Sequence, residues 1–90
     1  MDFNKLNKEL YLRGGHYKFA KKPTDFDKGY MKINDWVNDL CFYYIKRQEA
    51  FEKEIEIEFK MHVQEQKEKV LSLEPSLYKD GLLKAIDDVE

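Results

Sequence analysis

The longest pattern in the sequence is a stretch, residues 42–71, that contains no Gly, Pro, Asn, Asp, Ser or Thr. Chain reversals draw heavily on those residue types, and the stretch is filled instead with strong helix formers such as Glu, Lys, Gln and Leu. Asn34 or Asp35 can cap the start of a helix, and Pro75 ends it at about Leu73. The pattern therefore predicts one long helix over residues 34–73.

Residues 55–63 also fit a strand, because apolar and polar side chains alternate there with a period of two. A strand would have no turn on either side, however. In a helix, a set of apolar residues that recur every seven positions lies along one side. Glutamates also stand four residues before lysines, as in Glu56 and Lys60, which stabilises a helix. We favour the helix and keep the strand as the alternative.

Six consecutive apolar residues, Leu40 to Ile45, stand near the start of the predicted long helix. Because successive residues of a helix are about 100° apart, these side chains point around most of its circumference. We expect this segment to be covered on several sides.

The N-terminal region has two interpretations. Residues 10–19 read as a β-hairpin around a Gly14-Gly15 turn, with Leu10 and Leu12 facing Phe19 and Tyr17. The alternative is a short helix with Phe3, Leu6 and Leu10 on one face that stops at Gly14. The hairpin is slightly favoured.

Two further segments have helical spacing. Ser76 can cap a last helix, over residues 76–89, that folds back antiparallel after a short connection and is weakened by Gly81. After Pro23, Thr24 resembles a helix start, so the long helix can begin earlier with a bend near Gly29.

The fold class expected from these elements is mainly α. One small domain, residues 1–90, would contain a basic N-terminal segment (1–33) with a hairpin or short helix, the long helix (34–73) and a short antiparallel C-terminal helix (76–89).

Charge is distributed unevenly along the 90 residues, whose net charge is -2. Residues 1–33 carry a net charge of +4, and residues 34–90 carry -6. A strongly basic nucleic-acid protein and a polyacidic DNA mimic are both disfavoured. No apolar run approaches the ~18 residues of a membrane span, and the first residues lack the apolar region of a secretory signal. The single cysteine fits a reducing, cytoplasmic compartment.

Candidate chemistry is sparse, so we expect a non-enzymatic protein with no cofactor and no metal. Glu54, Glu58 and His62 share a helix face, but their spacing differs from that of di-metal bundles and no second such helix exists. Cys41 lies among apolar neighbours, which raise the pKa of a thiol and make it a poor nucleophile. No phosphate-binding glycine motif occurs.

The predicted long helix is the main functional candidate. It carries an apolar strip bounded by charges, which suits a helix-in-groove contact or a paired-helix interface. We expect a protein-binding module, such as an adaptor, assembly factor or inhibitor, that forms a homodimer in a coiled-coil-like manner. The partner-binding residues expected on this strip are Ile55, Ile57, Phe59, Met61, Val63 and Val70.

The alternative function is that of a nucleic-acid-binding accessory protein. Basic and aromatic residues interleave in the N-terminal segment, and such surfaces bind single strands through phosphate contacts and base stacking. The residues expected to contribute are Tyr11, Arg13, His16, Lys18, Lys21 and Lys22.

Overall fold

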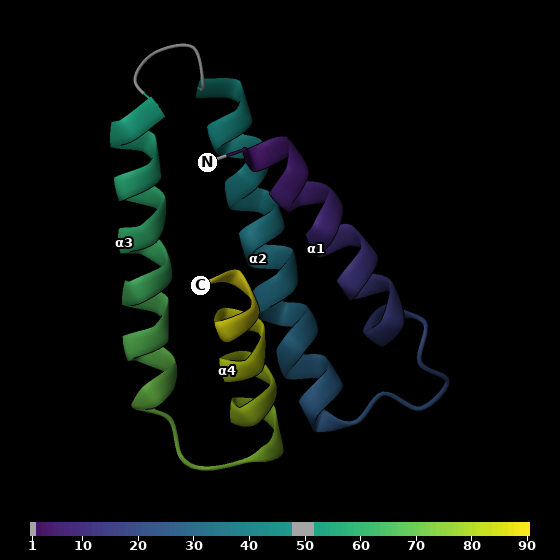
Figure 1. Cartoon of the computed structure of the whole chain (residues 1–90). Helices are drawn as coiled ribbons and strands as arrows, with labels where there is room; N and C mark the ends of the chain where they lie inside the picture. Colours follow the sequence, from purple (N-terminus) through teal and green to yellow (C-terminus); the bar gives the residue numbers. More distant parts are fainter. Residues whose placement is uncertain (1, 48–51) are drawn as a thin grey trace.

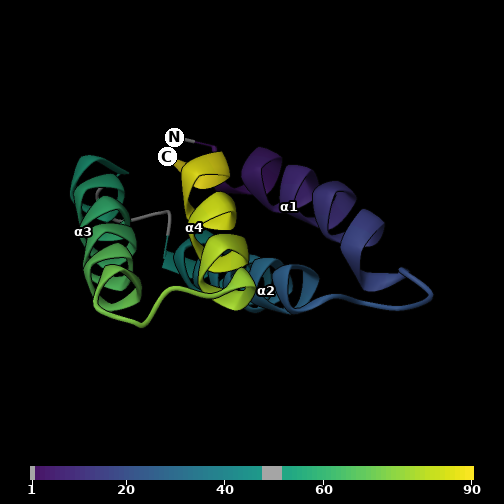
Figure 2. The ribbon, with the colours of Figure 1, turned by 90° about the horizontal axis from the view of Figure 1, so that it is seen from below.

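The described residues form a bundle of four helices, in which the second packs on the first and the fourth, and the third packs mainly on the fourth. A computed structural model describes residues 2–47 and 52–90, with only the backbone described for His16, Lys18 and Glu52. This part of the chain forms α1 (Phe3–Lys18), α2 (Asp25–Arg47), α3 (Glu52–Leu71) and α4 (Leu77–Val89). Helices that follow one another along the chain run in opposite directions (Figure 1). Seen from below, α4 lies between α1 and α3, and α2 lies beneath them (Figure 2).

Three helices begin at side chains that satisfy their free backbone amides. Asp2 accepts a hydrogen bond from the amide of Lys5 (3.1 Å), and Ser76 accepts one from the amide of Lys79 (3.1 Å). Before α2, the Thr24 hydroxyl accepts from the amide of Asp27, and the Asp27 carboxylate accepts from the amide of Thr24, at 3.2 and 2.9 Å. This reciprocal pair is a capping box, and it fixes the entry to α2.

The contact between α2 and α4 depends on two glycines that face each other's helices. A Cβ atom at Gly29 would collide with the backbone carbonyl oxygen of Tyr78, and one at Gly81 would collide with that of Phe26. The two backbones therefore approach more closely than any other residue type allows. Around this crossing the buried side chains of Ile33, Leu82 and other residues of both helices form the lower core.

The upper core, where α4 does not reach, is aromatic. Phe3 of α1 stacks on Tyr44 of α2 at a ring-centroid distance of 5.4 Å, and Phe59 of α3 meets both rings edge-on at 5.2 and 6.0 Å. Edge-to-face and offset arrangements at these distances are the favourable geometries for aromatic pairs. These three rings join α1, α2 and α3.

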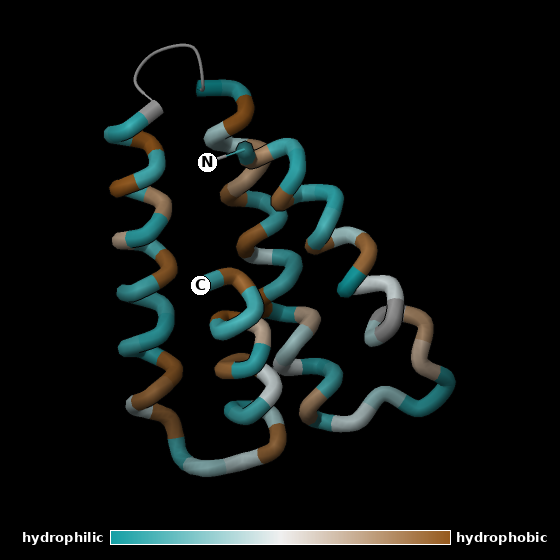
Figure 3. Tube along the Cα trace, in the orientation of Figure 1, coloured by the Kyte–Doolittle hydropathy of each residue, from teal (hydrophilic) through white to brown (hydrophobic). Residues whose placement is uncertain are grey.

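The assembly is flat, and many large apolar side chains remain exposed. The Cα positions extend over 42 × 29 × 15 Å, and the smallest dimension corresponds to two layers of helices whose axes lie about 10 Å apart. Apolar positions recur along every described helix in Figure 3, with hydrophilic positions between them. An assembly this thin cannot cover the apolar side chains on all sides of its helices.

The prediction of one long helix over residues 34–73 is wrong. Helix α2 begins earlier, at Asp25, and ends at Arg47, and α3 runs in the opposite direction from Glu52; residues 48–51 lie outside the described part. A single helix would have left Ile55, Phe59 and Val63 in water, whereas the folded-back helix buries them. Burial of an apolar face outweighs local helix propensity, which is worth only tenths of a kcal/mol per residue.

The β-hairpin prediction for residues 10–19 is also wrong, because α1 continues through both glycines to Lys18. Gly14 serves a close approach instead of a turn: a Cβ atom there would lie 2.6 Å from Nδ2 of Asn34. That amide donates a hydrogen bond of 3.0 Å to the carbonyl oxygen of Leu10, so Asn34 is buried between helices and does not cap one. The alternative prediction, a short helix, correctly places Phe3, Leu6 and Leu10 toward the core. It is wrong about where the helix ends, because α1 continues past Gly14 to Lys18.

Other expectations for individual elements are confirmed. Residues 55–63 are helical, not a strand. The last helix is capped by Ser76 and runs antiparallel to α3. The early start at Thr24 is correct as well, with Tyr30, Ile33 and Val37 on the buried face of α2.

The glycine crossing generates the first prediction. Gly29→Ala and Gly81→Ala should each lower the free energy of unfolding by about 1–3 kcal/mol, because the added methyl forces the backbones of α2 and α4 apart. Gly15→Ala is the matched control, since nothing lies within 4 Å of a Cβ atom there. It should raise stability by roughly 0.5–1 kcal/mol through helix propensity alone. Urea unfolding followed by circular dichroism measures all three, and equal effects would contradict the close crossing.

Candidate protein-binding groove

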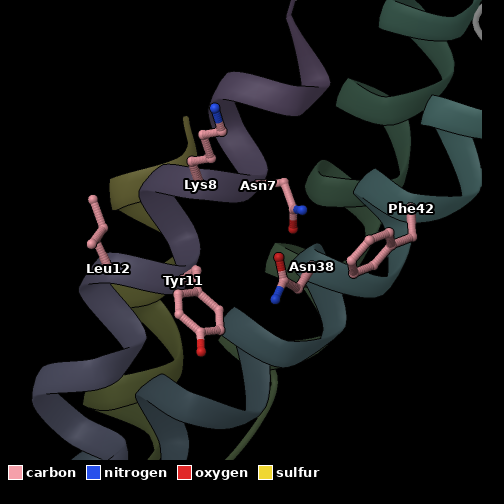
Figure 4. A pocket seen from close by; sticks show the side chains of 6 residues that line it. All are labelled: Asn7, Lys8, Tyr11, Leu12, Asn38 and Phe42. Carbon is pink, nitrogen blue, oxygen red and sulfur yellow. The ribbon is translucent and has the colours of Figure 1, made fainter.

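A hollow of the described surface lies between α1 and α2 on the side away from α4. Its wide part has a volume of ≈ 460 Å³. A narrower part of ≈ 110 Å³ continues it and shares Tyr11 and Asn38 with it. We call the two parts together the α1–α2 groove. The wide part is lined by Asn7, Lys8, Tyr11, Leu12, Asn38 and Phe42 (Figure 4).

Helical spacing explains why these residues meet. Phe3, Leu10 and Gly14 form the inner face of α1, and Asn7 and Tyr11, four residues apart, lie beside that face toward α2. Asn38 and Phe42 have the same spacing on α2. In Figure 4 the aromatic rings of Tyr11 and Phe42 flank the two asparagines, and Leu12 and Lys8 stand at the outer rim.

The floor of the wide part is polar and incompletely hydrogen-bonded. The side-chain oxygens Oδ1 of Asn7 and Asn38 are buried, and neither has a hydrogen-bond partner among the described residues. The two carboxamides face each other across the groove in Figure 4. A buried acceptor without a donor costs about 1–3 kcal/mol, so rotation of one carboxamide or a donor from a bound partner would stabilise this floor.

The walls of the groove are unusually apolar for a surface. Tyr11 is 75% exposed, Leu12 76%, Phe19 80% and Phe42 52%. Together they offer roughly 500 Å² of apolar and aromatic surface, within the range of the largest patches on soluble monomers, which are often functional. Exposed charges mark the ends: Lys8 borders the wide part and Asp35 the narrow part.

The groove is not predicted from the sequence, although the sequence contains a signal for it. The run from Leu40 to Ile45 was expected to be covered on several sides, and Phe42 and Tyr43 are instead half exposed. The hairpin prediction places Leu12 on the same face as Leu10, whereas in α1 it points away from Leu10 and Phe3. Three adjacent apolar residues, such as Leu10 to Leu12, cannot all face the core from one helix.

The structure divides the residues expected to bind a partner on the long helix. Ile55, Phe59, Val63 and Val70 are at most 4% exposed, in the core of the same chain. Ile57 and Met61 lie on the opposite side of α3 and are 60% and 57% exposed. The six therefore do not form one surface, and only Ile57 and Met61 are accessible to a partner.

The residues expected to bind nucleic acid are likewise not gathered on one face. Tyr11 lines the groove, whereas Arg13 points to α4 and donates a hydrogen bond of 2.8 Å to the carbonyl oxygen of Asp88. Lys21 and Lys22 are exposed in the connection between α1 and α2. The side chains of His16 and Lys18 lie outside the described part.

The candidate catalytic and metal-ligating residues are accounted for by local contacts. His62 lies 3.8 Å from Glu58 and 4.0 Å from Glu65 on the partly exposed side of α3, and Glu54 is exposed. No group of three or more His, Cys, Asp or Glu side chains suited to a metal occurs within the described residues. Cys41 is fully buried, and this burial raises the pKa of its thiol to about 11, which keeps it protonated and unreactive.

A hydrogen-bonded junction behind the groove holds α1, α2 and α4 together. The Tyr30 hydroxyl donates to Asp88 Oδ2 (2.6 Å), Tyr17 stacks on Tyr30 at 4.1 Å, and Lys84 pairs with Asp88 at 3.2 Å. Burial acts to raise the pKa of Asp88, but the hydrogen bond from Tyr30 and the charge of Lys84 outweigh it and hold that pKa below its ordinary value. Burial and the neighbouring Asp88 raise the pKa of Tyr30.

Comparisons with known proteins assign no relative. No protein-family model matches the sequence, and no curated protein or solved structure matches it significantly. Within the described part of the chain, no helix is both long and apolar enough to cross a membrane.

The junction at Asp88 generates a prediction about pH. Since its pKa is lower in the folded chain than in the unfolded one, Asp88 stabilises the fold above the unfolded pKa of about 4, and this contribution is lost as the pH falls through the folded pKa. Asp88→Asn should cost about 1–2 kcal/mol at neutral pH and flatten the acid limb of the stability profile.

Urea unfolding between about pH 7 and pH 3 measures this effect. Asp87→Asn is the control, because Asp87 is exposed beside Asp88 and should leave the profile close to that of the wild type. If both variants lose the same stability on acidification, Asp88 is not the group responsible.

Proposed function

We propose that the chain is a small, non-enzymatic protein-binding module, of the kind that acts as an adaptor, assembly factor or inhibitor, and that it binds through the α1–α2 groove. The observation that carries the proposal is the set of large side chains, Tyr11, Leu12, Phe19 and Phe42, exposed by half or more around one hollow. Aromatic anchors at the centre of a patch are typical of protein interfaces.

The chemistry of the groove supports contact and not bond breaking. The wide part offers two carboxamides, aromatic and aliphatic side chains and one lysine, without a carboxylate or thiol. A fitting partner presents one or two large apolar side chains, with a hydrogen-bond donor for the oxygens of Asn7 and Asn38. This is the pattern of an apolar side chain from another protein entering a groove between helices.

Two further proposals concern setting and role. A cytoplasmic location is supported by the single, buried Cys41, which needs no oxidising compartment. A regulatory role, as an inhibitor or an assembly factor, suits a small chain that acts by contact with another protein. The partner in the groove can also be a second copy of the same chain.

Nucleic-acid binding stands second. Lys21 and Lys22 are exposed, but Arg13 is engaged with Glu9 and Asp88, which leaves fewer cations to follow a phosphate backbone. A single-stranded oligonucleotide that binds in physiological salt, and is released by Lys21→Glu/Lys22→Glu, would favour this function over the groove.

The test uses the chain as bait in nuclease-treated extract of its native cells. The amount of protein captured should fall at least tenfold in the groove variant Leu12→Ser/Phe42→Ser, because each large interface side chain contributes on the order of 1–2 kcal/mol to binding. All these residues are exposed, so circular dichroism and the melting temperature should change little.

Ile57→Ser/Met61→Ser is the matched control, with two exposed apolar side chains removed from α3. The proposal requires that this control retain the captured protein. Capture that survives the groove variant, or that is lost only in the α3 variant, would place the binding surface elsewhere.

A further inference from the structure

The α1–α2 groove has two ends of opposite charge. Exposed Lys8 borders the wide end, beside Phe42. Exposed Asp35 borders the narrow end, beside Phe19. Among the residues that line the groove, each end therefore contributes one charge and one exposed phenylalanine.

Such a surface is complementary to itself. In a two-fold dimer both copies use the same patch. If residue i of one copy contacts residue j of the other, then residue j of the first copy also contacts residue i of the second. A rotation of 180° about an axis through the middle of the groove, near Tyr11 and Asn38, lays the Lys8 end of one copy on the Asp35 end of the other. Opposite charges then meet twice, which favours this orientation over the reverse.

The two ends also differ in shape. Phe19, at the end of α1, is 80% exposed, the most exposed of the large apolar side chains described. The wide end is a hollow of ≈ 460 Å³ between Tyr11 and Phe42. In the two-fold arrangement the projecting ring of each copy faces the hollow of the other.

We propose that the α1–α2 groove is occupied by a second copy of this chain, in a two-fold dimer in which Phe19 of each copy enters the wide end of the other and Lys8 pairs with Asp35 across the interface. This inference rests on the proposed function, because it names the partner of the same groove. It replaces the expected dimer through the long helix, whose apolar residues lie mostly in the core.

The surface area of the chain agrees with a dimer. The chain exposes 6416 Å², whereas a compact monomer of 10.9 kDa is expected to expose about 5600 Å². The excess of roughly 800 Å² is of the same order as the area that one partner contributes to an interface of standard size. The flat shape of the molecule, with its large exposed side chains, accounts for the excess.

Sedimentation equilibrium of the full chain, from a few to a few hundred micromolar, should show a mass rising toward twice 10.9 kDa. Phe19→Ala should weaken association at least tenfold, through loss of the ring from the partner's hollow. Ile57→Lys is the control on α3 and should leave association unchanged. A monomer at every concentration, or a dimer insensitive to Phe19→Ala, overturns the inference.

Charge reversal tests the orientation. Lys8→Glu and Asp35→Lys should each weaken self-association, because like charges then meet twice in every pair. An equimolar mixture of the two variants should associate as strongly as the wild type, since every cross-chain pair is again opposite. No contact within one chain can produce this rescue, so a mixture that stays monomeric overturns the pairing.

Failure of the inference is distinguishable from failure of the proposed function. A chain that is monomeric, but loses a captured protein through Leu12→Ser/Phe42→Ser, binds a different protein in the groove: the inference is then wrong and the proposed function holds. A dimer abolished by Ile57→Lys, with capture unaffected by the groove variant, contradicts both.

Discussion

The close crossing of α2 and α4 at Gly29 and Gly81 is the contact on which the arrangement of the helices depends. Neither helix could approach the other with a side chain at these positions, because the methyl would overlap a backbone carbonyl oxygen. Close approach brings Leu82 and Ile86 into the buried face of α2 and places Asp88 beside Tyr30 and Arg13. Helix α4 therefore covers one side of α2, and α1 contacts α4 as well as α2 through the hydrogen bond from Arg13 to Asp88.

This arrangement determines which surfaces are closed and which stay open. Helix α4 lies between α1 and α3 (Figure 2), so it covers one side of the α1–α2 pair and leaves the other uncovered. The open side is the groove with Tyr11 and Phe42 on its walls. A third layer of helix would normally cover such side chains in a larger domain, and the 15 Å thickness of this molecule provides none. A second copy of the chain would supply that layer.

Local patterns predicted the helices themselves better than their contacts. The Ser76 cap, the helical spacing after Thr24 and the helix over residues 55–63 all follow from neighbouring residues and are correct. Gly14 and Gly15 were predicted to form a turn, and Gly81 to weaken its helix. The close approaches of Gly14 and Gly81 to other helices were not predicted, because a contact between distant segments leaves no mark on local sequence. The change of direction between α2 and α3 lacks the usual turn residues, and of the groove only Tyr11 had been selected, for another function.

Paramagnetic labelling tests the central claim, reciprocal packing of two grooves, most directly. One chain, without isotope labels, carries a spin label on a cysteine introduced by Lys22→Cys at an exposed position, and its buried native cysteine is removed by Cys41→Ser. This chain is mixed with an isotope-labelled wild-type chain. Because Lys22 follows Phe19, the account predicts broadening of amide signals around Lys8 and Phe42 of the other copy. Broadening confined to the outer face of α3, around Ile57 and Met61, or no intermolecular broadening at all, would contradict it.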